Sequence, residues 1–204
     1  MAKERLKVGI IAAEHSSDRL GAKIIESLQD IFEIDLYGLG GPEVNANPIV
    51  TPNGIDYHDL HVMGLIDPLL KLPKILLNRR KLLKVFISNN IDIFIGVDSP
   101  DFNIFFHKKL KSNNVKTIQI VSPSVWGWRE NRIRSIEANI DLTMCLFKFE
   151  CDFYSKKNMH SFFLGHPFSQ LKPNNFENII KSHNLEASKN FISILPGSRS
   201  SEIS

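Results

Sequence analysis

The stretch IDIFIGVDSPDFN, residues 91–103, decides the fold of this 204-residue chain. Its first half is a run of mostly β-branched and aromatic apolar residues, which is typical of a strand buried on both faces of a parallel sheet. The run ends at Asp98, and residues 99–101 (Ser, Pro, Asp) have the composition of a helix N-terminus. We therefore predict a strand over 91–97 and a helix over 102–111.

The alternation of strand-like and helix-like segments continues along the whole chain. It predicts an α/β fold of βαβ units, with a Rossmann-like, doubly wound and mostly parallel sheet. The predicted strands are 8–13, 34–39, 91–97, 117–121, 142–147, 162–165 and 191–195. The predicted helices are 19–28, 66–88, 102–111, 132–138, 150–156 and 176–182.

Composition divides the chain into a long first part and a short last part. We expect residues 1–168 to form a complete domain and the polar, Asn-rich segment 169–190 to be a linker. Residues 191–204 have the pattern of a new strand and turn. We interpret them as the start of a second domain of which the rest is missing.

The overall composition, with 43% apolar and 23% charged residues, indicates a soluble globular protein. A net charge of +3 does not call for nucleic acid, and Cys145 and Cys151 match no common zinc or redox spacing. The apolar run near the N-terminus is too short for a signal peptide or a membrane span. We therefore expect a cytoplasmic protein.

Two carboxylates follow the 91–97 strand, and their positions favour different roles. Ligands of open α/β sheets bind outside the carboxyl ends of the strands, and Asp98 lies at such an end. Asp98 is therefore our candidate general base, with a structural carboxylate as the alternative. Asp101 falls in the first turn of the following helix, where negative charge is favourable anyway. For Asp101 a structural role is favoured over a catalytic one.

Two loops on the expected ligand side carry small or polar residues. The loop AAEHSSDRLGA, residues 12–22, lacks the G-x-G-x-x-G fingerprint, which argues against an NAD-linked protein. Its plainer interpretation is a helix start capped by Ser16, Ser17 or Asp18. The turn YGLGGPE, residues 37–43, permits either a close approach of the backbone to a ligand or an ordinary strand-to-loop turn.

Two further segments carry arginine beside a turn. In VSPSVWGWRENRIR, residues 121–134, the tryptophans are candidates for packing or ligand contact, and the arginines for phosphate binding. In LPGSRSSE, residues 195–202, backbone N–H groups, a hydroxyl and a guanidinium have the composition of an anion site. The alternative for the second segment is a loop with one exposed arginine.

Residues 62–87 are rich in leucine and are rimmed by lysine and arginine. Their prolines and lysines exclude a transmembrane helix. The alternatives are a long buried helix or an apolar, basic-rimmed surface that contacts a bilayer or acyl chains.

Seven short motifs, spread over essentially the whole chain, resemble the lipid-A-disaccharide synthase family and occur in the order expected of it. They are DRLGAKII, GLGGPE, VMGLID, GVDSPDFN, VSPSVWGWR, FLGHP and LPGSRSSEI. The resemblance implies that residues 1–168 are the N-terminal, acceptor-side and membrane-facing domain of a GT-B glycosyltransferase, in which two Rossmann-like domains face each other across a cleft. Where the first loop of the family usually reads GEASGD, Ala13 and Ser17 replace the two glycines.

The resemblance also implies a reaction. The family joins UDP-2,3-diacylglucosamine to 2,3-diacylglucosamine 1-phosphate, giving lipid A disaccharide 1-phosphate and UDP. We expect these two sugars and the inner-membrane surface as partners, with peripheral attachment and no nucleic acid. We expect no cofactor, and no metal because no D-x-D pair occurs near the site.

Carried over to this sequence, the resemblance places the general base on Asp98. The residues assigned to substrate contact are Glu14, Ser16, Asp18, Asp101, Ser124, Trp126 and Arg129. Those assigned to UDP are Gly197, Ser198, Arg199 and Glu202, and those assigned to acyl chains or membrane are Leu65, Leu69, Leu72 and Leu76. One alternative function stays open, that of a non-catalytic lipid-binding remnant or a subunit of a split enzyme.

Overall fold

The computed structural model describes residues 3–57, 67–125, 132–170, 172, 175–186, 189–192 and 194. The chain falls into two compact units, residues 1–167 and 168–204.

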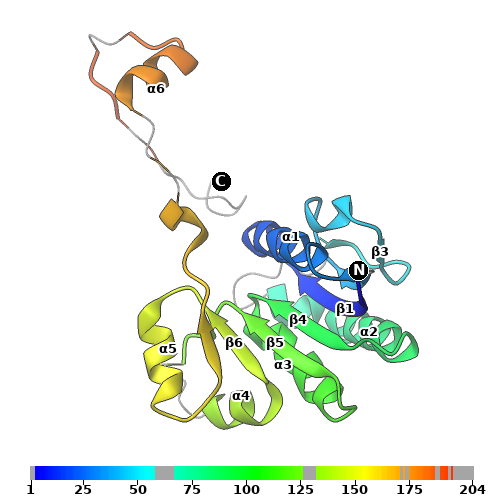
Figure 1. The fold of residues 1–204 in the computed structure, drawn as a ribbon. Coiled ribbons are helices and arrows are strands. Elements are labelled where there is room, and N and C mark those ends of the chain that lie inside the picture. Colours follow the sequence, from blue (N-terminus) through cyan, green and yellow to red (C-terminus); the bar gives the residue numbers. More distant parts are fainter. Residues whose placement is uncertain are drawn as a thin grey trace. The chain divides into compact units, whose positions relative to one another are not determined.

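The first unit is built around a seven-stranded sheet in which every pair of neighbours is parallel (Figure 1). The strand order is β3-β2-β1-β4-β5-β6-β7. The strands are β1 (Arg5–Ala12), β2 (Glu33–Leu39), β3 (Ile49–Val50), β4 (Ile93–Val97), β5 (Lys116–Ile120), β6 (Leu142–Cys145) and β7 (Ser161–Phe163). The predicted α/β, Rossmann-like class is confirmed.

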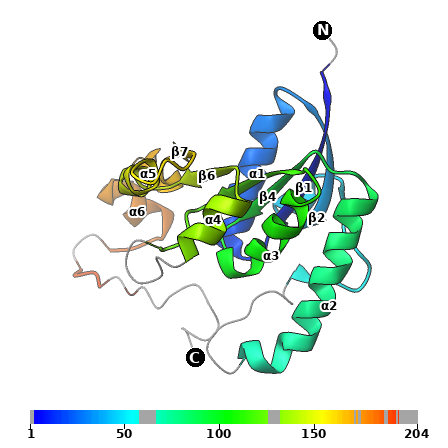
Figure 2. The ribbon, with the colours of Figure 1, turned by 90° about the horizontal axis from the view of Figure 1, so that it is seen from below.

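Helices cover both faces of this sheet. They are α1 (His15–Gln29), α2 (Asp67–Ser88), α3 (Pro100–Lys111), α4 (Ile133–Asn139) and α5 (Lys148–Ser155), with a short 3-10 helix η1 (Val44–Ala46) after β2. Helix α1 lies on one face, and α2 and α3 lie on the other (Figures 1 and 2). This arrangement explains why β4, the middle strand of the sheet, is apolar throughout.

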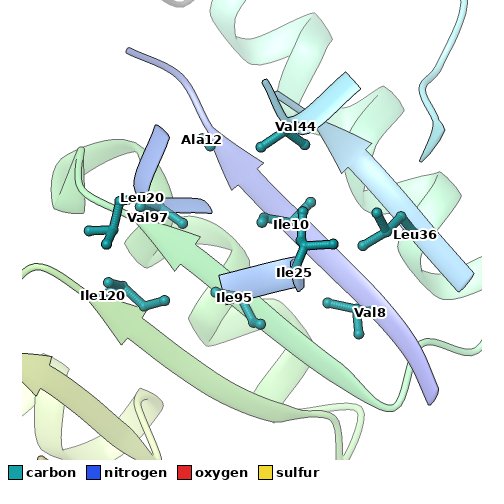
Figure 3. Close-up of a cluster of buried hydrophobic side chains, with 10 residues drawn as sticks. All are labelled: Val8, Ile10, Ala12, Leu20, Ile25, Leu36, Val44, Ile95, Val97 and Ile120. Carbon is teal, nitrogen blue, oxygen red and sulfur yellow. The ribbon is translucent and has the colours of Figure 1, made fainter. Parts of the chain in front are cut away.

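Strand β1 divides its residues between two cores, because successive side chains of a strand point to opposite faces. Val8, Ile10 and Ala12 pack against α1 on one face (Figure 3). Ile11 packs with α2 and α3 on the other face. Strand β4 is divided in the same way, so the run predicted at 91–97 is indeed buried on both sides.

Most predicted elements form with ends shifted by up to four residues, while one observed strand was not predicted and one predicted strand is not seen. Strand β3 was not predicted, because two residues carry no periodic signal. Strand β6 stops at Cys145 because Phe147 is already the N-cap of α5. The predicted strand 191–195 is not seen, since residues 191, 192 and 194 lie in no helix or strand and 193 and 195 lie outside the described residues.

The second unit contains the helix α6 (Phe176–Ser182), which matches its predicted range. Asn175 caps this helix, and its side chain accepts the N–H of Asn178 at 2.8 Å. A 3-10 helix, η4 (Pro167–Gln170), lies where the two units meet along the chain. The predicted linker and second domain stay predictions.

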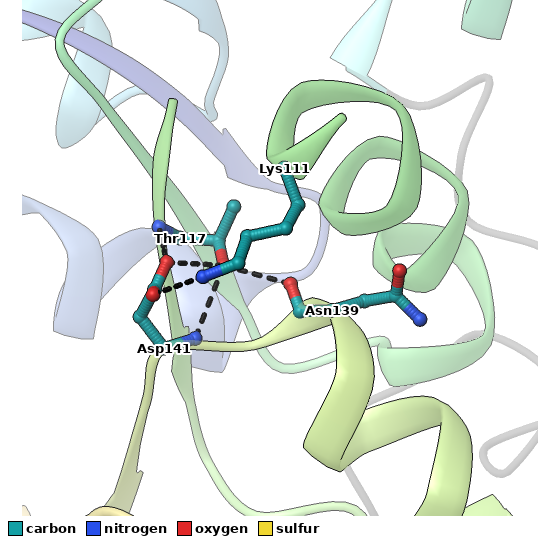
Figure 4. A network of polar contacts seen from close by, with 4 residues as sticks. All are labelled: Lys111, Thr117, Asn139 and Asp141. Atoms are coloured by element: carbon teal, nitrogen blue, oxygen red, sulfur yellow. Dashed lines mark hydrogen bonds and ion pairs between the residues drawn. The ribbon is translucent and has the colours of Figure 1, made fainter. Parts of the chain in front are cut away.

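A polar network joins the ends of two helices to the amino-terminal ends of β5 and β6 (Figure 4). Asp141, just before β6, forms an ion pair with Lys111 and accepts the N–H of Thr117 at 2.9 Å. Thr117 Oγ1 donates to the C=O of Asn139 at 2.8 Å. Burial alone would raise the pKa of Asp141, but Lys111 and Thr117 favour the carboxylate and bring the pKa below its ordinary value. The network therefore stabilises the amino-terminal ends of these strands, which lie opposite the expected ligand side.

Replacing Asp141 with Asn should lower the free energy of unfolding at neutral pH by about 1–2 kcal/mol, because hydrogen bonds to a charged acceptor are lost. Since the folded-state pKa is lowered, this stabilisation is fully present above about pH 4 and is lost as the pH falls through the folded-state value. In urea unfolding, the gap between wild type and Asp141→Asn should therefore narrow in acid. The control, Asp152→Asn, removes an exposed carboxylate on α5. A gap for Asp141→Asn that is constant with pH would contradict the assignment.

Candidate functional site

The strand order reverses between β4, the middle strand of the sheet, and its neighbour β1. From β1 the sheet extends to β2 and β3, and from β4 it extends to β5, β6 and β7. Ala12 and Val97 pair across this junction, so the first loop and Asp98 begin side by side at the carboxyl ends of the two strands. In open α/β sheets, ligands bind at this switch point.

Asp98 and Ser99 form a strained turn between β4 and α3. Their φ values are 54° and 40°, in the left-handed region that costs a non-glycine residue roughly 1–2 kcal/mol. The N–H of Asp98 donates to the C=O of Ile120 at 2.8 Å. Ser99 is the N-cap of α3 and Pro100 follows it, as predicted, although the Ser99 side chain makes no capping hydrogen bond. Such strain concentrates at functional sites, and the half-buried Asp98 lies within it.

The first loop leads directly into α1, and the cap predicted at Ser16, Ser17 or Asp18 is wrong. Helix α1 starts at His15, so Glu14 is the N-cap. Ser17 lies inside the first turn, where its Oγ accepts the N–H of Glu14 at 2.7 Å and donates to the C=O of Glu14 at 2.8 Å. The sequence pattern placed the cap too late because three polar residues in a row could each serve.

The two residues of this loop that replace glycines, Ala13 and Ser17, are 2% and 1% exposed. Their side chains are accommodated inside the protein, so they add no bulk to the exposed surface of the loop. At the carboxyl end of β1, Glu14 is half-buried and Ser16 is exposed.

Asp18 joins the first loop to the turn after β2. It is 2% exposed, and its carboxylate accepts the N–H groups of Gly41 (2.8 Å), Glu43 (2.9 Å) and Val44 (3.0 Å). A Cβ at Gly41 would lie 2.6 Å from Asp18 Oδ2. The backbone of the 37–43 turn thus approaches the carboxylate of Asp18, which belongs to the protein itself. The substrate contact assigned to Asp18 stays a prediction.

Asp101 lies in the first turn of α3, as predicted. Its exposed carboxylate forms an ion pair with Arg132, and its C=O accepts Nη2 of Arg79 at 2.9 Å. A cavity of about 260 Å³ lies beside this ion pair, with walls from α3, α4 and the segment after β5.

Three buried polar residues that the sequence analysis did not single out lie behind the Asp98 turn. Asn103 Nδ2 donates to the C=O of Asp98 at 2.7 Å, and Gln119 Nε2 donates to the same oxygen at 3.0 Å. His107 Nε2 lies 2.9 Å from Gln119 Oε1. The sequence carries a signal for the two helix residues only: Asn103 and His107 are four residues apart on a helix face that also carries Phe106 and Leu110. Gln119 follows the ordinary polar and apolar alternation of its strand, between Ile118 and Ile120.

Helix α2 is buried in one part and exposed in another, so the predicted burial is seen for only part of the 62–87 stretch, and contact with a bilayer or acyl chains stays a prediction. Leu82 and Phe86 are fully buried against the sheet. Leu72 and Leu76 are each 44% exposed. None of the helices within the described ranges is long and apolar enough to cross a membrane.

Several predicted site residues cannot be placed. Leu65, Trp126, Arg129, Gly197, Ser198, Arg199 and Glu202 lie outside the described residues, and Leu69 lies in α2 without a described side chain. Ser124 is exposed after β5. In the part of the chain that the structure describes, no group of three or more His, Cys, Asp or Glu could hold a metal ion.

A family model described as lipid-A-disaccharide synthetase matches residues 8–204. The chain belongs to the lipid-A-disaccharide synthase family. The lipid-A-disaccharide synthases of Acinetobacter baylyi and Pseudoalteromonas translucida are 36% and 39% identical to it over 208 and 204 residues. Lipid-A-disaccharide synthase 2 of Legionella pneumophila strain Paris is 38% identical over 207 residues.

These alignments cover 98% to 100% of this chain but only 52% or 53% of the relatives. The chain therefore spans about half the length of the curated relatives it matches. A solved structure, a putative UDP-N-acetylglucosamine 2-epimerase from Listeria monocytogenes, matches with a TM-score of 0.57 at 10% identity. That match covers 89% of this chain and 51% of the other, and it supports the Rossmann-like fold alone.

Replacing Asp18 with Asn should lower the free energy of unfolding by about 1–3 kcal/mol, because three backbone N–H groups lose a charged acceptor. The matched control is Glu43→Gln on the same turn, whose side chain is 54% exposed in its pair with Arg19. That change should cost less than about 0.5 kcal/mol. Urea unfolding measures both. Equal stability of the two variants would show that the carboxylate of Asp18 does not hold the turn.

Proposed function

We propose that this chain provides the acceptor-side half of a lipid-A-disaccharide synthase, with Asp98 as the general base. The observation that carries the proposal is the place of Asp98, a half-buried carboxylate in a strained turn at the switch point of the sheet. Family membership supports the proposed reaction, the joining of UDP-2,3-diacylglucosamine to 2,3-diacylglucosamine 1-phosphate.

In the proposed reaction, the Asp98 carboxylate accepts the proton of the acceptor's sugar hydroxyl as that oxygen attacks the anomeric carbon of the donor. The bond to UDP breaks on the opposite face, so one displacement inverts an α-linked donor to a β-linked product. The transition state is oxocarbenium-like, as in glycoside hydrolysis. Gly197, Ser198 and Arg199, which lie outside the described residues, are proposed to meet the charge of the departing UDP.

Glu14 and Ser16 are proposed to contact the polar groups of a substrate beside Asp98. Their loop begins next to Asp98 because Ala12 pairs with Val97. The exposed hydroxyl of Ser16 and the half-buried carboxylate of Glu14 are both suited to hydrogen bonds with a sugar.

The exposed part of α2 is proposed to contact the inner membrane from the cytoplasmic side. Both substrates carry acyl chains, and Leu72 and Leu76 offer them an apolar surface. Lys74, Arg80 and Lys84 are exposed on the same helix, where they would meet anionic headgroups.

The catalytic proposal predicts that Asp98→Asn lowers kcat by about 10²- to 10⁴-fold, the usual contribution of a positioned base. UDP release by the full-length protein that contains this chain is the measurement. The control is Asp92→Asn, because Asp92 lies just before β4 at the opposite end, where its carboxylate accepts the N–H of Lys7 at 2.8 Å. Asp92→Asn should keep turnover near that of wild type. Near-normal turnover by a folded Asp98→Asn would reject Asp98 as the base.

Vesicle sedimentation of the 204-residue chain itself, with a parallel UDP-release assay, addresses the non-catalytic alternative. Lipid binding by wild type without UDP release favours a lipid-binding remnant. UDP release only after a separately expressed C-terminal half is added favours a split enzyme.

The membrane proposal predicts that Leu72→Ser/Leu76→Ser reduces sedimentation with anionic phospholipid vesicles by roughly tenfold or more, since each leucine loses part of its burial energy of about 1.5–3 kcal/mol. Stability should change by less than about 0.5 kcal/mol per site, because both side chains are exposed. The control is Ile31→Ser, which removes a side chain that is 63% exposed after α1. Unfolding of the double variant, or unchanged sedimentation, would argue against membrane contact by this surface.

A further inference from the structure

A chain of buried polar groups runs from the middle of α3 to the Asp98 turn. It consists of His107 and Gln119, joined by a contact of 2.9 Å, and of Asn103, which reaches the same turn from the first part of α3. All three residues are fully buried. Polar side chains in an apolar core cost free energy unless every group is bonded. Among the described residues, neither Asn103 Oδ1 nor His107 Nδ1 has a hydrogen-bond partner, so stability alone is a poor explanation for this cluster.

The hydrogen bonds of Gln119 determine the direction of the chain. Its Nε2 lies 3.0 Å from the carbonyl oxygens of Asp98 and Ile120 and 3.3 Å from that of Val121. Carbonyl oxygens only accept, so the amide NH₂ must face them and Oε1 must face His107. His107 must then carry a proton on Nε2. Burial lowers the pKa of His107 to about 4, so at neutral pH the ring is uncharged and donates from that nitrogen.

The backbone that receives these bonds is strained at the ends of two neighbouring strands. Asp98 and Ser99 follow β4, and Val121 follows β5 with φ of 67°. For a β-branched residue such a φ is a clear outlier. Each such conformation is energetically unfavourable and persists only where its surroundings hold it. The amide of Gln119 lies between the two bends and donates to both.

Gly96 leaves the space that the two amides occupy. A Cβ at this position would lie 2.8 Å from Asn103 Nδ2 and 2.9 Å from Gln119 Oε1. The glycine two residues before Asp98 is therefore part of the same arrangement.

We propose that Gln119 and Asn103, the former oriented by His107, are positioning residues that hold the Asp98–Ser99 turn in its left-handed conformation and thereby aim the Asp98 carboxylate. The catalytic consequence rests on the proposed function of Asp98 as the base. The conformational part does not. A misplacement of a reacting group by about 1 Å can cost up to roughly 100-fold in rate, so a small change in this turn is sufficient to affect turnover.

The test uses Gln119→Met and Asn103→Leu in the full-length protein, because each keeps most of the side-chain volume and removes the donor to the Asp98 carbonyl. Both variants should lower kcat about tenfold or more while KM stays within about twofold, the pattern of an interaction that matters in the transition state. In crystal structures of the variants, the φ of Asp98 should leave the positive region.

The matched control is Thr117→Val, on the same strand and equally buried, which loses the hydroxyl bond to Asn139. It should lose similar stability and retain the kcat of wild type. For the histidine, His107→Gln keeps an N–H donor and should retain more kcat than His107→Phe, which keeps only an aromatic ring beside Phe94.

The proposal is overturned if Gln119→Met and Asn103→Leu retain kcat with Asp98 at positive φ, or if Thr117→Val lowers kcat as much as they do. An advantage of His107→Phe over His107→Gln would overturn the role of His107. If Asp98→Asn retains turnover, the proposed function fails instead, and the φ of Asp98 in the variant structures still decides whether these residues hold the turn.

Discussion

The parallel pairing of β1 with β4 is the interaction on which the rest of the molecule depends. The sheet grows outward from this pair in both directions, and residues of both strands enter both hydrophobic cores. The pair also brings together two segments more than 80 residues apart, the first loop and the Asp98 turn. Without this register, neither segment would have a neighbour with which to form a site.

The two ends of the parallel strands differ in backbone strain and in how fully their polar groups are hydrogen-bonded. At the amino-terminal ends of β5 and β6, Lys111, Thr117 and Asp141 form a satisfied network that favours the folded state. At the carboxyl ends of β4 and β5, the backbone turns through unfavourable conformations and the polar groups behind it are incompletely bonded. The stabilisation at the amino-terminal ends of the strands thus offsets the cost of the strained backbone at their carboxyl ends. This distribution is expected when a site requires a backbone geometry that is unfavourable for folding.

Much of the fold was predictable from the sequence, because buried parallel strands and amphipathic helices have distinct periodicities. The place of Asp98 was predictable for the same reason, since a carboxylate that ends an apolar run must lie at the end of a strand. The hydrogen-bond partners of the Asp98 carbonyl were not predictable. Gln119 has the pattern of an ordinary polar residue in a strand, and periodicity does not identify the residues on a neighbouring strand. The three N–H bonds of Asp18 depend likewise on a turn more than 20 residues away. The N-cap of α1 was missed because adjacent polar residues compete locally.

The tight space around Gly96 also bears on how this protein can diverge. Because a side chain at position 96 would collide with the amides of Asn103 and Gln119, the three positions share one fixed volume. A larger residue at 96 becomes acceptable only after position 103 or 119 has become smaller. That smaller residue would in turn remove one of the two side-chain donors to the carbonyl of Asp98. We therefore expect positions 96, 103 and 119 to change together, or not at all, as this protein diverges. A substitution at any one of them alone should disturb the Asp98 turn.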